Sequence, residues 1–223
     1  MKLSVIIPVF NEIKTIEEIL KRVQAVPLDK EIIIVDDGST DGTRDILKGL
    51  SSDNLKVVLK DKNQGKGSAI REGLKYISGD VVVIQDGDLE YDPFDWIKML
   101  EVMKEKNLSV IYGSRILGKG KKSSLAFYFG GRLLSVITNI LYGTKITDEP
   151  TCYKMFKTDL IKSIKLECMG FEFCPEVTAK VLKKRYKIYE VPIKYAPRNI
   201  KVGKKIRWKD GAIAIWTLLK HRF

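Results

Sequence analysis

The sequence has few of the residues that build covalent cross-links and zinc sites. Its 223 residues include three cysteines and one histidine. Cys152, Cys168 and Cys174 form no CxxC pair, so we expect neither a disulfide framework nor a zinc site, and a reducing compartment suits such a chain. The histidine, His221, lies almost at the end of the sequence, so we do not expect a histidine to act as the catalytic base.

Long hydrophobic runs are also lacking. No segment reaches the roughly 18 uninterrupted apolar residues that are typical of a membrane-spanning helix. The N-terminal stretch MKLSVIIPVF lacks the layout of a signal peptide. By this criterion we expect no transmembrane helix.

Positive charge, in contrast, is in excess. The 40 lysines and arginines outnumber the 28 acidic residues, which gives a formal net charge of +12. We therefore expect an anionic partner, which could be nucleic acid, anionic lipid or a phosphorylated substrate. Lysines that only keep the protein soluble would produce the same excess.

Apolar segments alternate with helical patterns through the first half of the chain. This alternation is typical of an α/β fold with an open, mostly parallel, doubly wound sheet. Apolar runs predict buried strands at residues 3–9, 31–35, 55–59, 81–84 and 109–112. In the second half we expect strands at 151–156 and 188–195, the latter at an edge because it contains a proline. Helices are predicted there at 125–142, 175–185 and 212–219.

Three carboxylates directly follow the fourth predicted strand, in the stretch VVVIQDGDLEYDP. Asp86, Asp88 and Glu90 would repel one another at the strand's carboxyl end unless a cation lay among them. Oxygen ligands without histidine or cysteine suit Mg²⁺ or Mn²⁺, ions that commonly also bind phosphate. The stretch therefore predicts a metal–diphosphate site, with a solvated acidic turn as the alternative. An EF-hand is excluded because Tyr91 and Ile97 occupy its glycine and glutamate positions.

Asp37 follows the second predicted strand at the same edge of the sheet. Its carboxylate could accept hydrogen bonds from a base or from ribose, as acidic residues do in dinucleotide-binding folds. However, no GxGxxG follows the first strand, and GKG at 65–67 lacks the rest of a Walker A motif. A dehydrogenase and a P-loop ATPase are therefore disfavoured. Lys66 could reach a phosphate or could be a surface lysine at a helix start.

The second half contains segments that could contact a membrane. Residues 125–142 are apolar nearly all round, interrupted by Gly130, Gly131 and Arg132, and follow a basic loop. Such a segment is either a buried helix pair or an amphipathic element in a membrane interface, and its aromatics favour the membrane. The apolar residues 212–219 include Trp216 and precede a basic end, so they allow the same two interpretations.

Seven motifs, in this order, cover nearly the whole chain: IIPVFNE, VDDGSTDGT, NQGKGSAIREG, QDGDLEYDP, YGSR, TDEPTCYKMF and PRNIKVGKKI. Together they resemble the family 2 glycosyltransferases of the GT-A fold, and within them the dolichyl-phosphate mannose synthase-like branch. The resemblance implies a hexosyltransferase, similar to dolichyl-phosphate β-mannosyltransferases, that moves a sugar with inversion. The donor would be a UDP- or GDP-linked sugar, and the acceptor a dolichyl, undecaprenyl or other polyprenyl phosphate.

The same resemblance implies one GT-A domain over residues 1–223. Its first half, 1–115, would bind the nucleotide sugar, and its second half, 116–223, would face the acceptor and an anionic membrane surface. The protein would be peripheral on the cytoplasmic face of that membrane.

Residue roles also follow from the resemblance. The nucleoside would be framed by Pro8, Phe10, Glu12, Val35 and Asp37. Mg²⁺ or Mn²⁺ would be held by Asp86, Asp88 and Glu90, with Gly87 also at the donor. Phosphates would meet Arg115, Arg198 and Lys204, and the lipid phosphate would meet Arg132. The catalytic residues would be Asp86, Asp88 and Arg115.

The chain departs from that branch at two places. Mannose synthases usually have glutamine at the position of Glu90, and a GxSK pattern where this chain reads Gly203-Lys204-Lys205. The sugar therefore stays open among mannose, glucose and related hexoses.

A phosphate acceptor fits the residues available for catalysis. It is already anionic at neutral pH and needs no general base, whereas the departing diphosphate needs neutralisation by a metal ion and arginines. A soluble or polysaccharide hydroxyl acceptor would require a base, for which Asp148 or Glu149 are the candidates. A basic nucleic-acid-binding protein is the remote alternative. It leaves the acidic cluster unexplained, and without a recognition module we expect no nucleic acid partner.

Overall fold

A seven-stranded sheet runs through the part of the chain that the computed structural model describes, residues 1–118, 124–198 and 208–223. Its spatial order is β3-β2-β1-β4-β6-β5-β7, and every pair except those of β6 is parallel. The strands are β1 (Leu3–Val9), β2 (Lys30–Asp36), β3 (Leu55–Leu59), β4 (Val81–Ile84), β5 (Val110–Ser114), β6 (Lys154–Lys157) and β7 (Tyr189–Pro192). This confirms the predicted open, mostly parallel α/β sheet.

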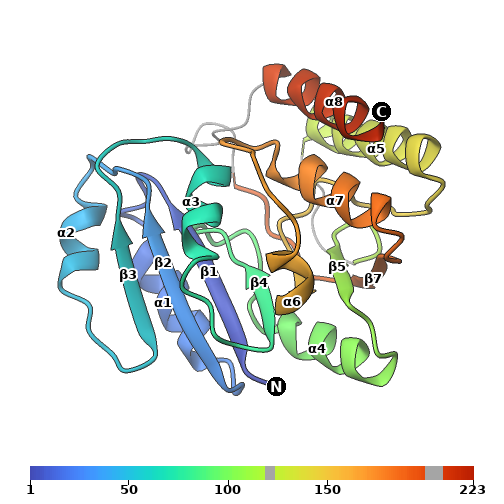
Figure 1. Cartoon of the computed structure of the whole chain (residues 1–223). Coiled ribbons are helices and arrows are strands. Elements are labelled where there is room, and N and C mark those ends of the chain that lie inside the picture. The colour runs from blue at the N-terminus through green and yellow to red at the C-terminus, as the bar shows by residue number, and fades with distance from the viewer. Residues whose placement is uncertain (119–123, 199–207) are drawn as a thin grey trace.

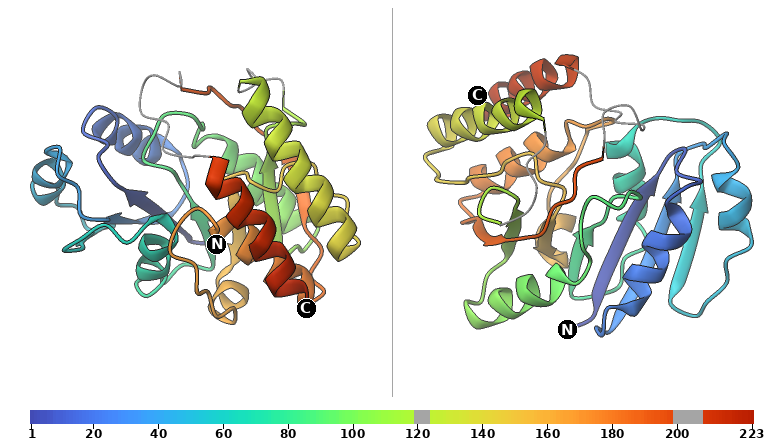
Figure 2. Two further views of the ribbon diagram at one scale, coloured as in Figure 1. Left: turned by 90° about the horizontal axis from the view of Figure 1, so that it is seen from above. Right: turned by 180° about the vertical axis from the view of Figure 1, so that it is seen from behind.

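Helices cover both faces of the sheet (Figures 1 and 2). They are α1 (Ile16–Ala25), α2 (Thr43–Lys48), α3 (Lys66–Gly73), α4 (Asp95–Glu105), α5 (Leu125–Tyr142), α6 (Thr158–Lys162), α7 (Phe173–Lys183) and α8 (Trp208–Arg222). Helices α1 and α4 lie on one face, and α3 and α6 lie on the other. The helices that connect parallel strands therefore lie on both faces of the sheet, as in a doubly wound fold.

The strands β1, β2 and β4 form the centre of the core because valine and isoleucine dominate their sequences. Such side chains pack well in a sheet that is covered on both faces. Strand β1 lies between β2 and β4, with Val9 opposite Asp36 and Ile6 opposite Ile84. The carboxyl ends of these strands open at one edge, where Asp37 and Asp86 follow, as the sequence predicted.

Strand β6 reverses direction and lies between β4 and β5. It begins at Lys154, three residues later than the strand predicted at 151–156. Because β6 is antiparallel to β4, the residues before it, 148–153, reach the edge where β4 ends. There the Tyr153 hydroxyl donates to Gln85 Oε1 at 2.7 Å. Strand β7 lies at the edge of the sheet, as expected from its proline.

Helices α5 and α8 lie side by side over α7, at the top of Figure 1. In α5 only Ser135 and Thr138 are buried, so the interpretation of 125–142 as a core helix pair is wrong. Apolar side chains are exposed along both helices, namely Leu125, Phe129, Leu133, Val136, Ile140, Trp208, Ile213 and Trp216.

By length and composition α5 is long and apolar enough to cross a membrane. The criterion of an uninterrupted run missed this, since Gly130, Gly131 and Arg132 break the apolar sequence. One such helix is weak evidence by itself, because the core helix of a soluble protein and a signal sequence meet the same test. In α5, however, only 11% of the residues are buried, unlike a core helix.

Candidate active site

A cavity of about 1340 Å³ follows the carboxyl edge of the sheet and continues beneath α5 and α8. It gathers most of the predicted site residues: Pro8, Phe10, Glu12, Asp37, Asp86, Gly87, Asp88, Glu90, Arg115, Arg132, Asp148, Glu149 and Arg198. Val35, predicted at the nucleoside, is a fully buried core residue of β2 and does not line the cavity. Lys204 lies outside the described residues.

Asp37 holds the loop before α3 against the cavity. Its Oδ2 accepts hydrogen bonds from the backbone N–H groups of Gln64 at 3.0 Å and Gly65 at 2.6 Å, and its Oδ1 pairs with Lys60. Loop residues Asn63 and Gly65 consequently line the cavity beside Asp37. Asp37 is buried. Its side chain therefore fixes the conformation of the loop before α3, in addition to lining this end of the cavity.

Asp86 and Asp88 follow β4 and have opposite pKa shifts. Burial opposes ionisation of Asp86, but the ion pair with Lys66 holds the pKa of Asp86 below its ordinary value. Burial and the negative charge of Asp86 raise the pKa of Asp88 to about 7. Asp88 Oδ1 accepts from the backbone N–H of Glu90 at 3.0 Å, and its Oδ2 accepts from the Arg198 guanidinium at 2.8 Å.

Arg198 lies among three carboxylates. Besides Asp88, its guanidinium is 3.1 Å from Glu12 Oε2 and 3.7 Å from Glu90 Oε1. Glu90 in turn accepts hydrogen bonds from the Tyr195 hydroxyl at 2.8 Å and from the backbone N–H of Arg198 at 3.0 Å. Glu90 therefore anchors the segment that carries Arg198.

The predicted metal ligands do not form a ready-made metal cluster. Within the described residues, no group of three or more His, Cys, Asp or Glu side chains is arranged to hold a metal ion. Glu90 is engaged by Tyr195 and Arg198, and its role as a ligand stays a prediction. Within residues 1–118, 124–198 and 208–223, Lys66 nevertheless pairs with Asp86, and Arg198 pairs with Glu12, Asp88 and Glu90. Such hard oxygen donors suit Mg²⁺ or Mn²⁺.

On the opposite wall, Arg115 and Asp148 form a closed pair. The Arg115 guanidinium donates to both carboxylate oxygens of Asp148, at 2.8 and 2.7 Å, and the backbone N–H of Arg115 donates to the same carboxylate at 2.8 Å. The guanidinium also lies 5.1 Å from the ring centroid of Tyr195. Asp148, the first candidate base for a hydroxyl acceptor, is therefore occupied and almost completely buried.

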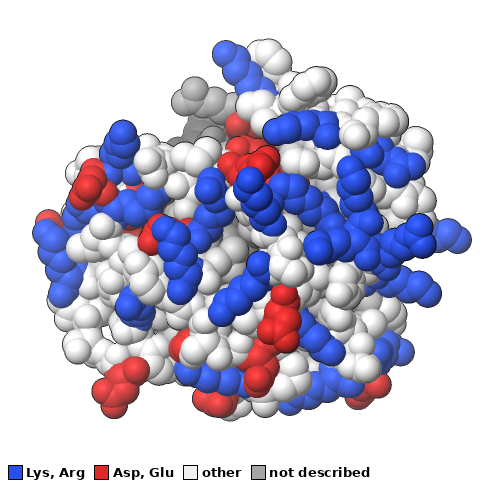
Figure 3. Space-filling model, in the orientation of Figure 1, with Lys and Arg blue, Asp and Glu red and all other residues white. Residues whose placement is uncertain are grey.

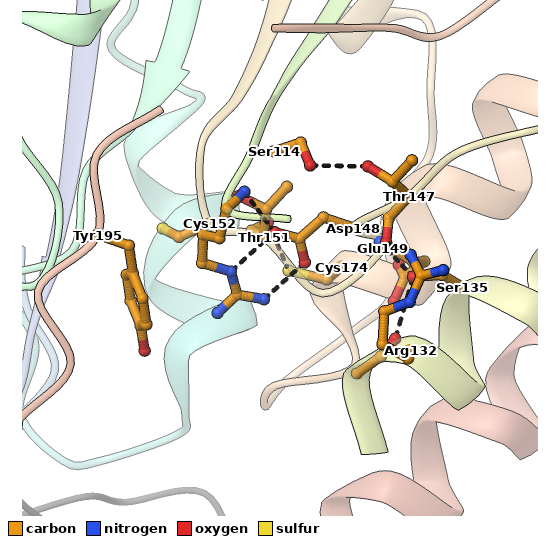
Figure 4. A network of polar contacts seen from close by, with 12 residues as sticks. Ser114, Arg132, Ser135, Thr147, Asp148, Glu149, Thr151, Cys152, Cys174 and Tyr195 are labelled. Carbon is orange, nitrogen blue, oxygen red and sulfur yellow. Dashed lines mark hydrogen bonds and ion pairs between the residues drawn. The ribbon is translucent and has the colours of Figure 1, made fainter. Parts of the chain in front are cut away.

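Glu149, the second candidate base, belongs to a buried polar network (Figure 4). Its side chain is completely buried, and burial raises its pKa. Its backbone N–H donates to Ser135 Oγ at 2.9 Å, and its carbonyl accepts from Lys154 Nζ at 2.6 Å. These contacts tie the loop before β6 to α5 and to the core.

Arg132 is the arginine that α5 contributes to the cavity. It donates to the carbonyl oxygen of Thr147 at 2.9 Å, and no carboxylate of residues 1–118, 124–198 or 208–223 forms an ion pair with it. Its charge is thus available for an anion. The sequence did not indicate Tyr195, Lys154 or the pairing of Lys66 with Asp86, because these partners are distant in the chain and carry no motif.

The sheet and its acidic edge define an α/β protein of the GT-A type, and solved structures share this fold. Glucosyl-3-phosphoglycerate synthase from Mycobacterium tuberculosis, solved with Mn²⁺, UDP-glucose and phosphoglyceric acid, superposes with a TM-score of 0.76 at 21% identity, over 99% of this chain and 79% of that one. Mannosyl-3-phosphoglycerate synthase from Rubrobacter xylanophilus gives 0.75 at 19% identity, over 99% and 72%. At these identities the likeness concerns the fold alone.

The chain belongs to glycosyl transferase family 2, whose model matches residues 4–165. It is 32% identical to a dolichol-phosphate mannosyltransferase of Pyrococcus furiosus, over 89% of this chain and 57% of that protein. It is 29% identical to a dodecaprenyl-phosphate galacturonate synthase of Rhizobium johnstonii, over 92% and 62%. It is also 29% identical to a low-salt glycan biosynthesis hexosyltransferase of Haloferax volcanii, over 88% and 48%. The chain thus spans about half to three fifths of the length of these relatives.

Proposed function

We propose that this protein is a hexosyltransferase that moves a sugar from a nucleotide diphosphate sugar to a polyprenyl phosphate, with inversion. The observation that carries the proposal is the continuity of one cavity. It extends from the carboxylates after β4 to the space beneath α5 and α8, whose outer faces expose apolar side chains. A nucleotide sugar and a lipid phosphate could therefore meet inside it.

The donor would lie in the half of the domain formed by residues 1–115. Pro8, Phe10 and Asp37 line the cavity and would surround the nucleoside, and the carboxylates after β4, which line it too, would lie near the diphosphate. Asp86 and Asp88 would hold Mg²⁺ or Mn²⁺, which would neutralise charge on the departing diphosphate. Arg198, already at Asp88, could add its charge to the same group.

The acceptor would enter from the half formed by residues 116–223. Its phosphate oxygen forms the new bond to the sugar's anomeric carbon while the bond to the nucleoside diphosphate breaks. No proton has to be removed, because the attacking phosphate is already ionised at neutral pH. A reaction without a general base agrees with this wall of the cavity, where the carboxylate of Asp148 is paired with Arg115. Arg132, which donates to a backbone carbonyl, would bind the acceptor's phosphate.

Membrane attachment would follow from the surface of the second half. The exposed apolar side chains of α5 and α8 could insert into the bilayer interface. Lys and Arg gather on the face that carries α7 and α8 (Figure 3). The segments just before α7 and at its end contribute exposed basic residues, Lys165, Lys183, Lys184, Arg185 and Lys187. Each basic residue near an anionic surface adds about 1 kcal/mol to binding. The protein would then be peripheral on the cytoplasmic leaflet, where nucleotide sugars and anionic lipids occur together.

A transfer assay tests the proposal. Purified protein is incubated with Mn²⁺ or Mg²⁺, a short-chain polyprenyl phosphate and UDP-glucose, GDP-mannose or UDP-galacturonate in turn, and the glycolipid is detected by mass spectrometry. We expect product with at least one donor and none in EDTA. Arg132→Ala should lower lipid-dependent turnover about a hundredfold, since charge-stabilising contacts at a reacting group are commonly worth that much, while nucleotide-sugar binding is retained.

Lys145→Ala is the matched control, because Lys145 is exposed just after α5 and does not line the cavity. It should behave as the wild type does. Transfer only to soluble hydroxyl acceptors, with polyprenyl phosphate inert for all donors, would contradict the lipid acceptor and point to the hydroxyl alternative.

A further inference from the structure

We propose that Glu190, on the edge strand β7, is a positioning residue for the acceptor, an inference that rests on the proposed function. Glu190 holds the dipeptide Thr147-Asp148 in place. That dipeptide in turn orients Arg132 and Arg115, which lie on the same wall of the cavity. Glu190 is partly buried and does not itself line the cavity. It can therefore act on a bound acceptor only through the residues that it contacts.

The carboxylate of Glu190 binds two consecutive backbone N–H groups. Its Oε2 accepts a hydrogen bond from the N–H of Thr147 at 2.7 Å, and its Oε1 accepts from the N–H of Asp148 at 3.0 Å. Hydrogen bonds to an ionised acceptor are stronger than those between neutral groups, and neighbouring N–H groups form a compact site for an anion. Without the carboxylate both donors would lose their acceptor, so the dipeptide would no longer be held in this conformation.

The other polar groups of the dipeptide contact the two arginines (Figure 4). The carbonyl oxygen of Thr147 accepts from the Arg132 guanidinium at 2.9 Å. The carboxylate of Asp148 accepts from the Arg115 guanidinium at 2.8 and 2.7 Å. The N–H groups that bind Glu190 and the oxygens that bind the arginines belong to the same two residues. A rotation of the dipeptide would therefore displace both arginines.

The loop that contains the dipeptide also holds α5 over the cavity. Two further α5 residues contact this loop. Ser135 Oγ accepts from the N–H of Glu149 at 2.9 Å, and the Asn139 side chain forms two hydrogen bonds with the backbone of Ile146, both at 2.9 Å. Residues spaced as Arg132, Ser135 and Asn139 are lie on one face of a helix. Because few residues of α5 are buried, these polar contacts are needed to keep that face toward the cavity.

Glu190 should consequently affect the acceptor and leave the donor unaffected. The acceptor's phosphate is proposed to bind Arg132, whose guanidinium and helix both depend on the loop 146–149. The nucleoside would instead be bound by residues that follow other strands, namely Phe10 after β1 and Asp37 after β2. A residue that supported only the fold would affect both ends of the cavity.

Kinetic and binding measurements on Glu190→Ala separate the two ends. The variant is assayed with Mn²⁺, a short-chain polyprenyl phosphate and whichever of UDP-glucose, GDP-mannose and UDP-galacturonate the wild type uses. We expect the KM for the polyprenyl phosphate to rise about tenfold to a hundredfold, because two charge-assisted hydrogen bonds that orient the site are lost. At saturating acceptor, kcat should stay within about threefold of the wild-type value, and so should the Kd of the nucleotide sugar in titration calorimetry.

Glu190→Gln tests whether a conservative change restores part of the effect. Glutamine has the same length, but its single amide oxygen can accept from only one of the two N–H groups. The KM for the polyprenyl phosphate should therefore rise only about threefold to tenfold. If Glu190→Ala does not fold, this variant alone decides between a raised and an unchanged KM.

Glu31→Ala is the matched control. Glu31 also accepts from two consecutive backbone N–H groups, those of Ser78 and Gly79. It lies near the amino end of β2, whereas the cavity follows the carboxyl ends of the strands. Its removal should lower the melting temperature, and KM, kcat and Kd should all stay at their wild-type values.

An unchanged KM for the polyprenyl phosphate in a folded Glu190 variant would overturn the inference. Equal losses of acceptor and donor affinity would overturn it too, because Glu190 would then support the fold as a whole. A wild-type protein that transfers no sugar to polyprenyl phosphate would instead contradict the proposed function itself.

Discussion

At the scale of the residue, Arg198 is the cation that Glu12, Asp88 and Glu90 share. Its guanidinium forms an ion pair with Asp88, the carboxylate that is also proposed to bind a divalent metal ion. The arginine and the metal ion would therefore compete for Asp88. A metal ion that binds Asp88 would release the arginine, which could then contact the diphosphate. Arg198 would thus neutralise the carboxylates without the donor and assist the leaving group with it.

Removing this arginine should separate metal binding from catalysis. At pH 8, Arg198→Gln should bind Mn²⁺ in the absence of nucleotide at least about tenfold more tightly, because an ion pair to Asp88 no longer has to be broken. Turnover should fall about a hundredfold to a thousandfold, since a preorganised charge at the leaving group is lost. Titration calorimetry with Mn²⁺ and the transfer assay measure the two effects.

Arg22→Gln serves as the control, because Arg22 pairs with Glu18 on the exposed side of α1. Weaker Mn²⁺ binding in Arg198→Gln than in the wild type would contradict the competition. The arginine would then be needed to position the carboxylates.

At the scale of the element, α4 is joined to the segment after β7 through Asp95. Asp95 Oδ2 accepts a hydrogen bond from the backbone N–H of Lys194 at 2.8 Å. Burial raises the pKa of Asp95 to about 6, although the bond from Lys194 acts in the other direction. The folded state therefore holds this proton more tightly than the unfolded chain, in which the group has its ordinary value of 3.8.

This shift predicts a pH dependence of stability with a definite sign. Below about pH 4 Asp95 is protonated in both the folded and the unfolded state, and it does not lower the free energy of unfolding. As the pH rises from about 4 to 6, the unfolded chain releases the proton while the folded protein keeps it, so the free energy of unfolding falls. Asp95→Asn, which can still accept from Lys194, should therefore raise the melting temperature relative to the wild type at pH 7 and leave it nearly unchanged at pH 4. Calorimetric scans between these values measure the difference.

Glu105→Gln, at the exposed end of the same helix, provides the comparison and should show no such dependence. A constant difference between Asp95→Asn and the wild type across the pH range would argue against the shifted titration. The substitution would then act only through packing.

At the scale of the whole molecule, exposed apolar side chains and basic residues occur together on the second half. On α5, Phe129 and Leu133 are more than half exposed, at 63% and 54%, and are one helical turn apart. Phe94, which is 45% exposed, precedes α4 at the opposite end of the molecule (Figure 1). The two ends can therefore be compared directly.

Flotation with vesicles that contain an anionic phospholipid tests membrane attachment. The wild type should float at low salt and less so at high salt, because salt screens the basic residues. Phe129→Glu/Leu133→Glu should reduce the bound fraction at least about tenfold, since two apolar side chains lose their insertion energy. Phe94→Glu should float as the wild type does. Equal flotation of all three proteins would exclude α5 as the attachment surface.

The sequence by itself determined the elements and the position of the acidic edge. Strand β4 and helix α5 have the predicted ends, because the hydrophobic periodicity that specifies a strand or a helix is local. The alternation of strands and helices implied a parallel sheet. A parallel sheet brings strand ends together, so Asp37, Asp86 and Asp88 could be expected in one site.

Only the tertiary structure decided which side chains partner one another. Val35 lies in the core, as its predicted buried strand requires, and does not line the cavity where the resemblance had placed it. Glu90 shares Arg198 with Asp88 and also accepts a hydrogen bond from Tyr195. Strand β6 entered the sheet in reverse and thereby carried Asp148 to Arg115. The position of α5 on the surface likewise depended on its packing against α7 beneath it and α8 beside it. These outcomes depend on contacts between residues far apart in the chain, whose energies no local pattern encodes.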